Sequence, residues 1–344
     1  MNDEGAASRY ARQIRFGAWG AERQALLERA CVAVLGCGAL GCASANALAR
    51  AGVGRLRLID RDQVEWSNLQ RQWLFDEADA REGQLKAVAA ARQLGRANSS
   101  IVYEPVVADI DARNIEEHLD GVDLVLDATD NFETRYLLND YCVDLGMPWI
   151  YGAAVGSYGL AFAILPGTGP CLRCIYPEAP KGAQPTCETA GVLNTITAQV
   201  GFWQAALAMK ILGGEAPASW LTTFDTWDGK TRQIEVARDA QCPCCGQRNF
   251  EFLDGRRRAP VSLCGRDAVQ IHERQGRLDL LALEKELSGL GVGKRNEFAL
   301  RFVPTEKAGG VALEMTIFPD GRAIIKGTTD PALARTVYAR YVGR

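Results

Sequence analysis

The sequence predicts an α/β protein with a doubly wound, mostly parallel sheet, to which an antiparallel portion and a small C-terminal α+β domain are added. Two observations lead to this prediction. Apolar, β-branched runs alternate with helical segments through the first part of the chain, which is typical of parallel sheets covered by helices on both faces. Later strands follow one another across short turns, which is typical of antiparallel pairing.

The alternation starts after a helical opening and connector over 7–30. A strand at 31–36, a helix over 39–51 and a strand at 55–60 form one βαβ unit, whose length fits a parallel crossover. The pattern continues with helices at 83–98, 112–120 and 131–146 and with strands at 101–107 and 122–129.

Antiparallel strands are expected in the next part of the chain. Two strands surround a Gly-Ser turn in 148–165, and strands at 221–227 and 231–237 are joined by an Asp-Gly turn. Between these pairs, the segment 191–212 approaches the length of a membrane span, but it contains Asn, Gln and Lys side chains. We interpret it as a buried or subunit-interface helix.

A domain boundary is expected where a charged linker follows the last cysteine pair. We assign residues 1–250 to the first domain and residues 255–344 to the second. The second domain is predicted to contain a strand at 261–271, a helix at 280–290, a strand at 298–304, a hairpin at 311–327 and a helix at 331–343.

Composition and charge exclude several classes of function. A net charge of −3 provides no basic field for nucleic acid binding, and the polar N-terminus has no apolar signal segment. We therefore expect a cytoplasmic protein that binds no membrane and is poorly suited to bind nucleic acid non-specifically.

A glycine-rich turn, Gly36-x-Gly38-x-x-Gly41, follows the first strand and opens the first long helix, as in Rossmann-like nucleotide sites. Gly36 permits the turn, Gly38 lets a phosphate approach the backbone, and Gly41 lets helix and strand pack closely. Asp60, at the end of the next strand, is placed to accept a hydrogen bond from a ribose hydroxyl. The turn alone does not distinguish NAD from ATP, or either from a glycine turn without a ligand.

Polar residues just beyond the second strand favour ATP. Asn68, Arg71 and Gln72 lie close together in the sequence, and a site that cleaves a triphosphate needs such fixed donors, whereas a dehydrogenase does not. Lys86, on the following helix, adds a point charge suited to a phosphate oxygen. Asp130 follows a buried strand at the carboxyl edge of the sheet, where ligands collect, and its carboxylate can hold Mg²⁺.

Two Cys-x-x-Cys pairs, Cys171/Cys174 and Cys242/Cys245, have the spacing of a Cys₄ zinc site. In a reducing cytosol such pairs favour metal over disulfides. Neither pair has a histidine nearby, so this site is expected to be closed and structural. Cys244 is an alternative ligand within the second pair, and thiols without a metal are the other interpretation.

Further motifs join these in a fixed order along the chain. The full set is Arg9-Tyr10-Ala11-Arg12-Gln13, the glycine loop, SNLQRQ at 67–72, Lys86, DATDN at 127–131, the two cysteine pairs and TCETAG at 186–191. Together they resemble the ThiF/MoeB family, bacterial relatives of ubiquitin-activating enzymes that adenylate sulfur-carrier proteins. The resemblance extends from Ser8 to Gln247, and the tail resembles that of the longer ThiF proteins of some bacteria.

This resemblance implies an adenylylation reaction. The C-terminal glycine carboxylate of a ubiquitin-like carrier ending in Gly-Gly attacks the α-phosphate of ATP, which gives an acyl-adenylate and pyrophosphate. By resemblance, Asp60 holds the ribose and Asp130 binds magnesium. The phosphates are bound by Asn68, Arg71, Gln72 and Lys86. ATP, Mg²⁺ and Zn²⁺ are therefore the expected cofactors.

Two other residues gain a role from the resemblance. Arg12 matches an arginine that relatives deliver from the partner subunit, which implies a homodimer; the alternative is a surface salt bridge. Cys187 matches the cysteine by which some relatives join the carrier covalently, and a position before a helix lowers a thiol's pKa. An inert loop cysteine is the alternative. A cysteine desulfurase or sulfurtransferase is the implied sulfur donor.

Other functions stay open at this point. The same chemistry serves thiamine-thiazole, molybdopterin and related sulfur pathways, and its acceptor could instead be a peptide C-terminus or a tRNA carboxylate. A non-catalytic scaffold subunit is a third interpretation, against which the joint presence of Arg12, Arg71, Lys86 and Asp130 argues. An NAD oxidoreductase is disfavoured because no hydride-transfer domain is recognisable.

Overall fold

The computed structural model describes residues 9–178, 187, 189–256, 268–271, 278–296, 299–307, 310–319, 321–328 and 330–343. The chain divides into two compact units, Met1–Val261 and Ser262–Arg344. Each unit is described by itself.

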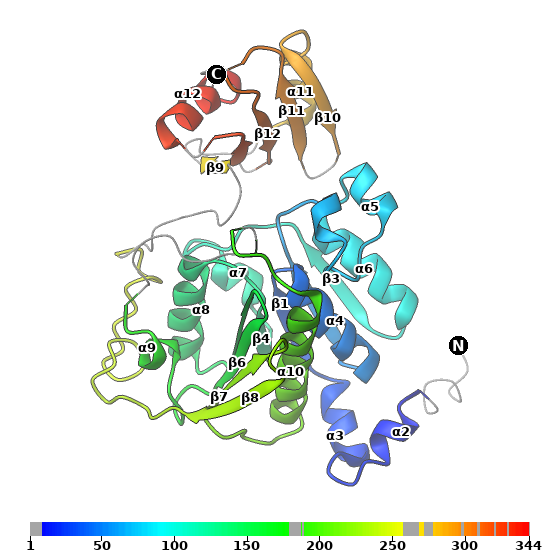
Figure 1. Ribbon diagram of the computed structural model, residues 1–344, viewed down its shortest axis with the longest axis vertical. Helices are drawn as coiled ribbons and strands as arrows, with labels where there is room; N and C mark the ends of the chain where they lie inside the picture. The colour runs from blue at the N-terminus through cyan, green and yellow to red at the C-terminus, as the bar shows by residue number, and fades with distance from the viewer. Residues whose placement is uncertain are drawn as a thin grey trace. The chain divides into compact units, whose positions relative to one another are not determined.

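The first unit is built on a sheet with the strand order β3-β2-β1-β4-β5-β6-β7-β8 (Figure 1). Its strands are β1 (Cys31–Leu35), β2 (Arg55–Ile59), β3 (Val102–Val106), β4 (Leu124–Asp127), β5 (Trp149–Val155), β6 (Tyr158–Ile164), β7 (Trp220–Asp225) and β8 (Lys230–Glu235). Strands β3 to β5 in this order pair in parallel, and β5 to β8 pair antiparallel. The predicted fold class, a Rossmann-like sheet with an antiparallel extension, is confirmed.

Helices cover both faces of this sheet (Figure 1). The longer ones are α4 (Ala39–Ala51), α6 (Lys86–Ala97), α8 (Phe132–Leu145) and α10 (Asn194–Leu212). Side chains alternate along each strand, so that Val32 and Val34 of β1 enter the core beneath α4 and α6, whereas Ala33 and Leu35 enter the core beneath α8. Burial on both faces explains why these strands read as continuous apolar runs.

Short helices complete the unit, and several differ from the predicted pattern. They are α2 (Ala11–Ile14), α3 (Gly20–Leu27), α5 (Glu77–Glu82), α7 (Ile115–Leu119), α9 (Leu172–Ile175) and the 3₁₀ turn η1 (Trp66–Asn68). The expected helical opening over 7–30 is two short helices, α2 and α3. Helix α5 was not predicted; Asp76 caps it by accepting a hydrogen bond from Asp79 N at 3.0 Å.

Helix α10 packs along α4 and against β5 and β6. Its buried side chains fill the core under the sheet, and Phe202 stays 42% exposed on its outer side. Among the described residues, none of the helices combines the length and apolarity needed to cross a bilayer.

The second unit is an antiparallel sheet with the strand order β10-β11-β12-β13-β9. Its elements are β9 (Ala268–Ile271), α11 (Leu280–Glu286), β10 (Gly291–Arg295), β11 (Leu300–Pro304), β12 (Glu314–Ile317), β13 (Ala323–Lys326) and α12 (Pro331–Tyr341). The sequence reasoning missed β10, because this edge strand is mostly exposed and has little apolar content. Residues 261–267 of the strand predicted at 261–271 lie outside the described residues.

Candidate active site

The candidate site lies between β1 and β4, where successive strands stop being added on one side of the sheet and are added on the other. Strands β1 and β4 are neighbours, but the chain continues from β1 toward β2 and from β4 toward β5. In open α/β sheets, ligands bind at the carboxyl ends of the strands beside such a reversal. The glycine loop follows β1 and the DATDN segment follows β4, so both predicted motifs meet at this edge.

The glycine loop leaves room beside Gly38, at the start of α4. Gly36 has a φ of 95°, and a Cβ on Gly41 would lie 1.9 Å from the Gly36 carbonyl oxygen, so neither position accepts a side chain without a shift. Gly38 caps α4, and the nearest atom to its hypothetical Cβ is Gln72 Nε2 at 3.9 Å. Room is therefore left beside Gly38 at the N-terminus of α4, which is where helices bind anions.

Asp60 is fixed beside this loop by two backbone donors. Its Oδ2 accepts a hydrogen bond from Cys37 N and its Oδ1 accepts one from Asp62 N, each at 2.7 Å. Burial raises the pKa of Asp60, and the nearby charge of Lys86 opposes that rise. The structure thus brings Asp60, Lys86 and the glycine loop together.

Lys86 is only 4% exposed at the start of α6. Its backbone N–H donates to the carbonyl oxygen of Asp62 at 2.8 Å, and its Nζ lies 3.3 Å from Asp62 Oδ2. A buried ammonium needs such a partner, because desolvation of an isolated charge is costly. The sequence reasoning missed Asp62; a second acid two residues after the strand end was the available signal.

The segment after β2 places one of its predicted donors next to the glycine loop. Gln72 is 4% exposed, its Nε2 faces Gly38, and its Oε1 has no hydrogen-bond partner among the described residues. Asn68 has a local role as well, since its Oδ1 accepts a hydrogen bond from Glu65 N at 3.0 Å and completes the capping box of η1. Arg71 is half-buried and donates to the Ser67 carbonyl oxygen at 2.8 Å.

The DATDN segment contains two acids in different environments. Asp130 is exposed, whereas Asp127, the last residue of β4, is fully buried. Asp127 Oδ1 accepts from Thr129 N at 2.9 Å and from Thr129 Oγ1 at 2.6 Å, and Oδ2 accepts from Arg135 Nε at 3.1 Å. Burial raises the pKa of Asp127, against the influence of Arg135 and Thr129. The sequence reasoning missed this ion pair.

The four predicted thiols form one cluster. The Sγ atoms of Cys171, Cys174, Cys242 and Cys245 all lie within 4.8 Å of one another, with 3.6 Å between Cys171 and Cys242 and 3.4 Å between Cys174 and Cys245. Four thiolates around a tetrahedral zinc ion at ~2.3 Å are separated by about 3.8 Å. The donor set and its spacing therefore fit such an ion.

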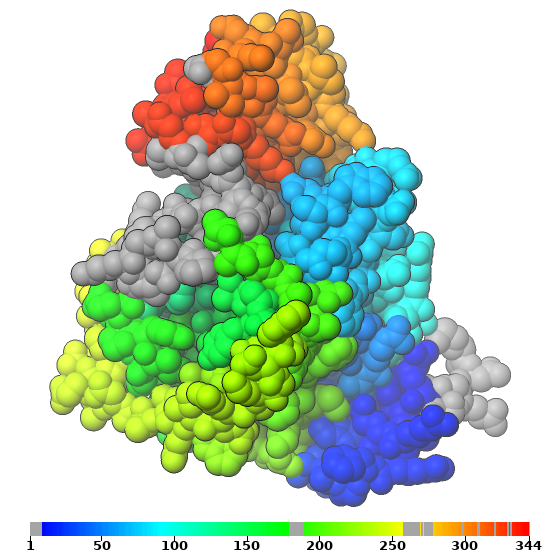
Figure 2. Space-filling view, viewed as in Figure 1, coloured from blue at the N-terminus to red at the C-terminus, as the bar shows by residue number. Residues whose placement is uncertain are grey.

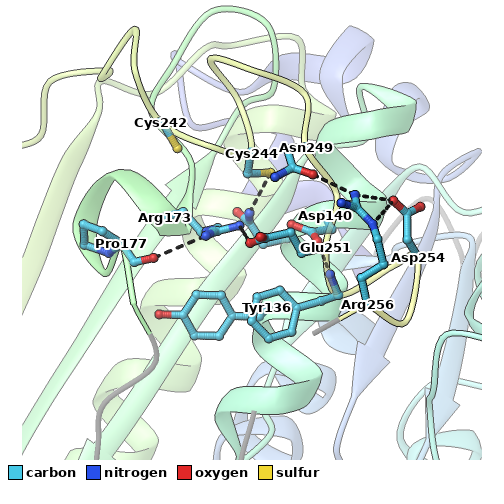
Figure 3. A network of polar contacts seen from close by, with 12 residues as sticks. Tyr136, Asp140, Arg173, Pro177, Cys242, Cys244, Asn249, Glu251, Asp254 and Arg256 are labelled. Carbon is cyan, nitrogen blue, oxygen red and sulfur yellow. Dashed lines mark hydrogen bonds and ion pairs between the residues drawn. The ribbon is translucent and has the colours of Figure 1, made fainter. Parts of the chain in front are cut away.

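Cys244 is not part of this thiol group. Its Sγ accepts a hydrogen bond at 3.1 Å from Asn139 Nδ2 of α8, and Asn139 Oδ1 accepts one at 2.8 Å from Leu172 N. Figure 3 shows the surrounding polar network, in which Arg173 pairs with Glu251 at 3.0 Å. Helix α8 thus supports both cysteine segments.

Arg12 lies far from the glycine loop of its own chain. Its short helix α2 is tied to the C-terminal end of α4, because Gln13 Nε2 donates to the Ala51 carbonyl oxygen at 2.9 Å and Tyr10 packs against Gly52. The loop is at the other end of α4, about 18 Å away at 1.5 Å per residue. Arg12 is exposed, and no carboxylate pairs with it among the residues that the structure describes. In Figure 2 the α2–α3 segment (dark blue) projects at the surface of the unit.

Cys187 is half-buried, and its Sγ lies 3.8 Å from the carbonyl oxygen of Ala154 near the end of β5. Residues 179–186 and 188 lie outside the described part of the chain. The remainder of the TCETAG motif, 189–191, leads toward α10.

Comparisons with known proteins agree with this architecture. A model of the ThiF family matches residues 10–244. The sulfur carrier protein ThiS adenylyltransferase of Bacillus subtilis (strain 168) is 40% identical over 342 residues, which cover 97% of this chain and 99% of that protein. The SAMP-activating enzyme E1 of Haloferax volcanii is 41% identical over 249 residues, covering 72% of this chain and 91% of that one.

A crystal structure of E. coli MccB with ATP is similar in fold. It has a TM-score of 0.61 and 25% sequence identity, over 69% of this chain and 74% of that one. The family resemblance that the motifs indicated is therefore confirmed: this chain belongs to the ThiF family.

Proposed function

We propose that this chain is an adenylyltransferase that uses ATP to activate the C-terminal glycine carboxylate of a ubiquitin-like sulfur carrier, releasing pyrophosphate. The carrier adenylyltransferases at about 40% identity support this function. The observation that carries it is the edge of the sheet at β1 and β4, where an accessible helix N-terminus lies beside Lys86, Gln72 and a fixed carboxylate.

ATP fits this edge by charge and by hydrogen bonding. The N–H groups at the start of α4 and the ammonium of Lys86 meet the phosphates, and Gln72 and Arg71 add donors near the glycine loop. Asp60, oriented by Cys37 N, accepts from a ribose hydroxyl. Asn68 donates to a phosphate through its amide nitrogen, because its amide oxygen already caps η1.

Two metal ions complete the proposal. Mg²⁺ binds with Asp130, whose exposed carboxylate follows the buried end of β4, and the ion neutralises charge on the triphosphate. Zn²⁺ binds the four clustered thiols and has a structural role, because all four protein ligands leave no open position for a substrate.

The active form is a homodimer in which Arg12 serves the partner's nucleotide site. The distance along α4 prevents Arg12 from reaching its own glycine loop, which is about 18 Å away. Trp73 and Phe202 are 44% and 42% exposed, with ring centroids 6.0 Å apart. Trp73 directly follows Gln72, so this apolar surface adjoins the site, and exposed aromatic pairs of this kind mark interfaces.

Sulfur transfer follows adenylation. A cysteine desulfurase or sulfurtransferase supplies the sulfur in the cytoplasm. The Cys187 thiolate attacks the carbonyl carbon of the carrier acyl-adenylate, which forms a thioester and releases AMP. The half-buried Cys187 thiol beside β5 is compatible with this step. The C-terminal unit supports carrier docking or the dimer. Thiamine-thiazole and molybdopterin synthesis are the candidate pathways.

The test is ATP–pyrophosphate exchange with carriers that end in Gly-Gly. Wild type, Lys86→Ala, Cys187→Ala and the control Lys230→Ala, at an exposed position of β8, are compared. We expect carrier-dependent exchange that Lys86→Ala reduces at least 100-fold. Lys230→Ala retains it because β8 lies outside the candidate site, and Cys187→Ala retains it because the covalent step follows adenylation. If exchange depends on a peptide or a tRNA instead, that molecule is the acceptor of the adenylyl group. If the protein binds ATP tightly but catalyses no exchange, it is a scaffold subunit.

A further inference from the structure

Arg135 places its guanidinium against the loop that follows β4. The residue lies in the first turn of α8 and is 6% exposed. Besides its contact with Asp127 Oδ2, it uses Nη2 to donate to the carbonyl oxygens of Thr129, at 2.6 Å, and Gly152, at 3.2 Å. One side chain therefore joins the end of β4, the following loop and β5.

Two aromatic rings contact this guanidinium. Its central carbon lies 5.2 Å from the ring centroid of Phe132 and 5.0 Å from that of Tyr151. Burial alone lowers the pKa of Arg135, but interactions with Tyr151, Asp127 and Asp130 outweigh burial and raise it. Arg135 thus stays charged, and Asp130 is close enough to interact with it.

The residues on both sides of Asp130 are held in place. Thr129 is bound through its N–H and Oγ1 to Asp127, and through its carbonyl oxygen to Arg135. Asn131 caps α8, since its Oδ1 accepts from Thr134 N at 2.8 Å. Asp130 itself is exposed between these two anchors.

We propose that Arg135 is a positioning residue: by fixing Asp127 and Thr129, it determines where the Asp130 carboxylate meets the magnesium ion of bound ATP. The inference rests on the proposed function, in which Asp130 serves Mg²⁺. Lysine cannot replace Arg135, because an ammonium cannot match the planar fork that reaches a carboxylate and two carbonyl oxygens.

Arg57 offers a matched control. Its Nε donates to Glu104 Oε2 at 2.8 Å, and its Nη1 donates to the carbonyl oxygens of His118, at 2.9 Å, and Asp120, at 2.8 Å. This guanidinium also joins one carboxylate and two carbonyl oxygens, but it links β2 and β3 to the end of α7. Arg57→Lys therefore makes the same chemical change outside the candidate site.

The experiment measures the Mg²⁺ dependence of ATP–pyrophosphate exchange in wild type, Arg135→Lys and Arg57→Lys, together with Mn²⁺ binding to the ATP-loaded proteins by electron paramagnetic resonance. We expect Arg135→Lys to need roughly tenfold more Mg²⁺ for half-maximal exchange and to bind Mn²⁺ correspondingly more weakly. Metal-free ATP affinity stays within about twofold of wild type, because the phosphate donors are untouched. Arg57→Lys matches wild type in all three measurements.

An unchanged metal requirement in Arg135→Lys, or equal shifts in both variants, overturns the inference. If Arg135→Lys does not fold, Thr129→Val is used instead, because it removes only the Oγ1 donor to Asp127, and Thr129→Ser is its control. We then expect Thr129→Val to need more Mg²⁺ and Thr129→Ser to match wild type. Equal Mg²⁺ requirements in the two variants overturn the inference. Absence of exchange in wild type contradicts the proposed function instead, and the Mn²⁺ affinities still decide the role of Arg135.

Discussion

The glycines of the loop after β1 differ in how much room they have for a side chain. A methyl group on Gly41 would meet the carbonyl oxygen of Gly36 at 1.9 Å, which is backbone and cannot rotate away. At Gly38 the nearest neighbour is the flexible end of Gln72, at 3.9 Å. Gly41 is therefore required for packing, whereas a side chain at Gly38 would meet no backbone atom.

This difference predicts that a Gly→Ala substitution affects protein stability at one position and ATP affinity at the other. Gly41→Ala should destabilise the protein by about 2–4 kcal/mol, because helix and loop must separate. Gly38→Ala should leave the melting temperature nearly unchanged but weaken ATP binding at least tenfold, because the methyl group occupies the phosphate approach. Thermal unfolding and titration calorimetry on both variants measure this, and a Gly38→Ala protein that binds ATP normally would contradict the assignment of the loop.

At the scale of elements, α8 connects the two functional regions of the first unit. Its first turn contains Arg135, which braces the end of β4, and its next turn contains Asn139, which binds Cys244 and the backbone of Leu172. Asp140 accepts a hydrogen bond from Phe252 N at 2.9 Å, and burial raises its pKa to about 6. The helix is thereby anchored to both cysteine segments, which are far apart in the sequence.

Measuring the metal content of cysteine variants should distinguish the four zinc-binding thiols from Cys244. Purified wild type is expected to contain one zinc ion per chain, and Cys245→Ser to lose it with a fall in melting temperature, because the two segments are then untied. Cys244→Ser should retain the metal, since its thiol accepts a hydrogen bond from Asn139 and lies outside the four-thiol cluster. Elemental analysis with a thermal melt measures both, and metal loss in Cys244→Ser would assign that thiol as a ligand.

At the scale of the whole molecule, the placement of α2 bears on the proposed homodimer. Tyr10 and Gln13 hold this helix against the C-terminal end of α4, where Asn98 Nδ2 donates to Tyr10 OH at 2.8 Å. Arg12 lies between them and is exposed. This position is what the proposed homodimer needs, in which Arg12 acts on the nucleotide site of the partner subunit.

Mixing two inactive variants tests this arrangement. Arg12→Ala and Lys86→Ala homodimers should each be nearly inactive, because every site in them lacks one group. After subunit exchange, about half of the dimers are mixed, and each of these has one complete site, so about a quarter of wild-type exchange activity should return. No recovery, despite subunit exchange verified by mass spectrometry, would place Arg12 outside the reaction.

Local sequence determined much of the first unit and of its candidate site. Apolar, β-branched runs and glycine punctuation placed the strands and the glycine loop, because both signals are properties of a few consecutive residues. The paired thiols were likewise recognisable from spacing alone, and they do cluster. The family resemblance rested on the same local motifs and is confirmed.

Only the tertiary structure revealed which distant groups meet. The Asp62–Lys86 and Asp127–Arg135 pairs join residues that gain partners only when strands and helices pack, and strand β10 exists only through its pairing with β11. The same holds for Arg12, whose distance from the glycine loop follows from where α2 docks on α4. The physical reason is that the desolvation of a charge and the pairing of an edge strand depend on neighbours in space, which local pattern does not encode.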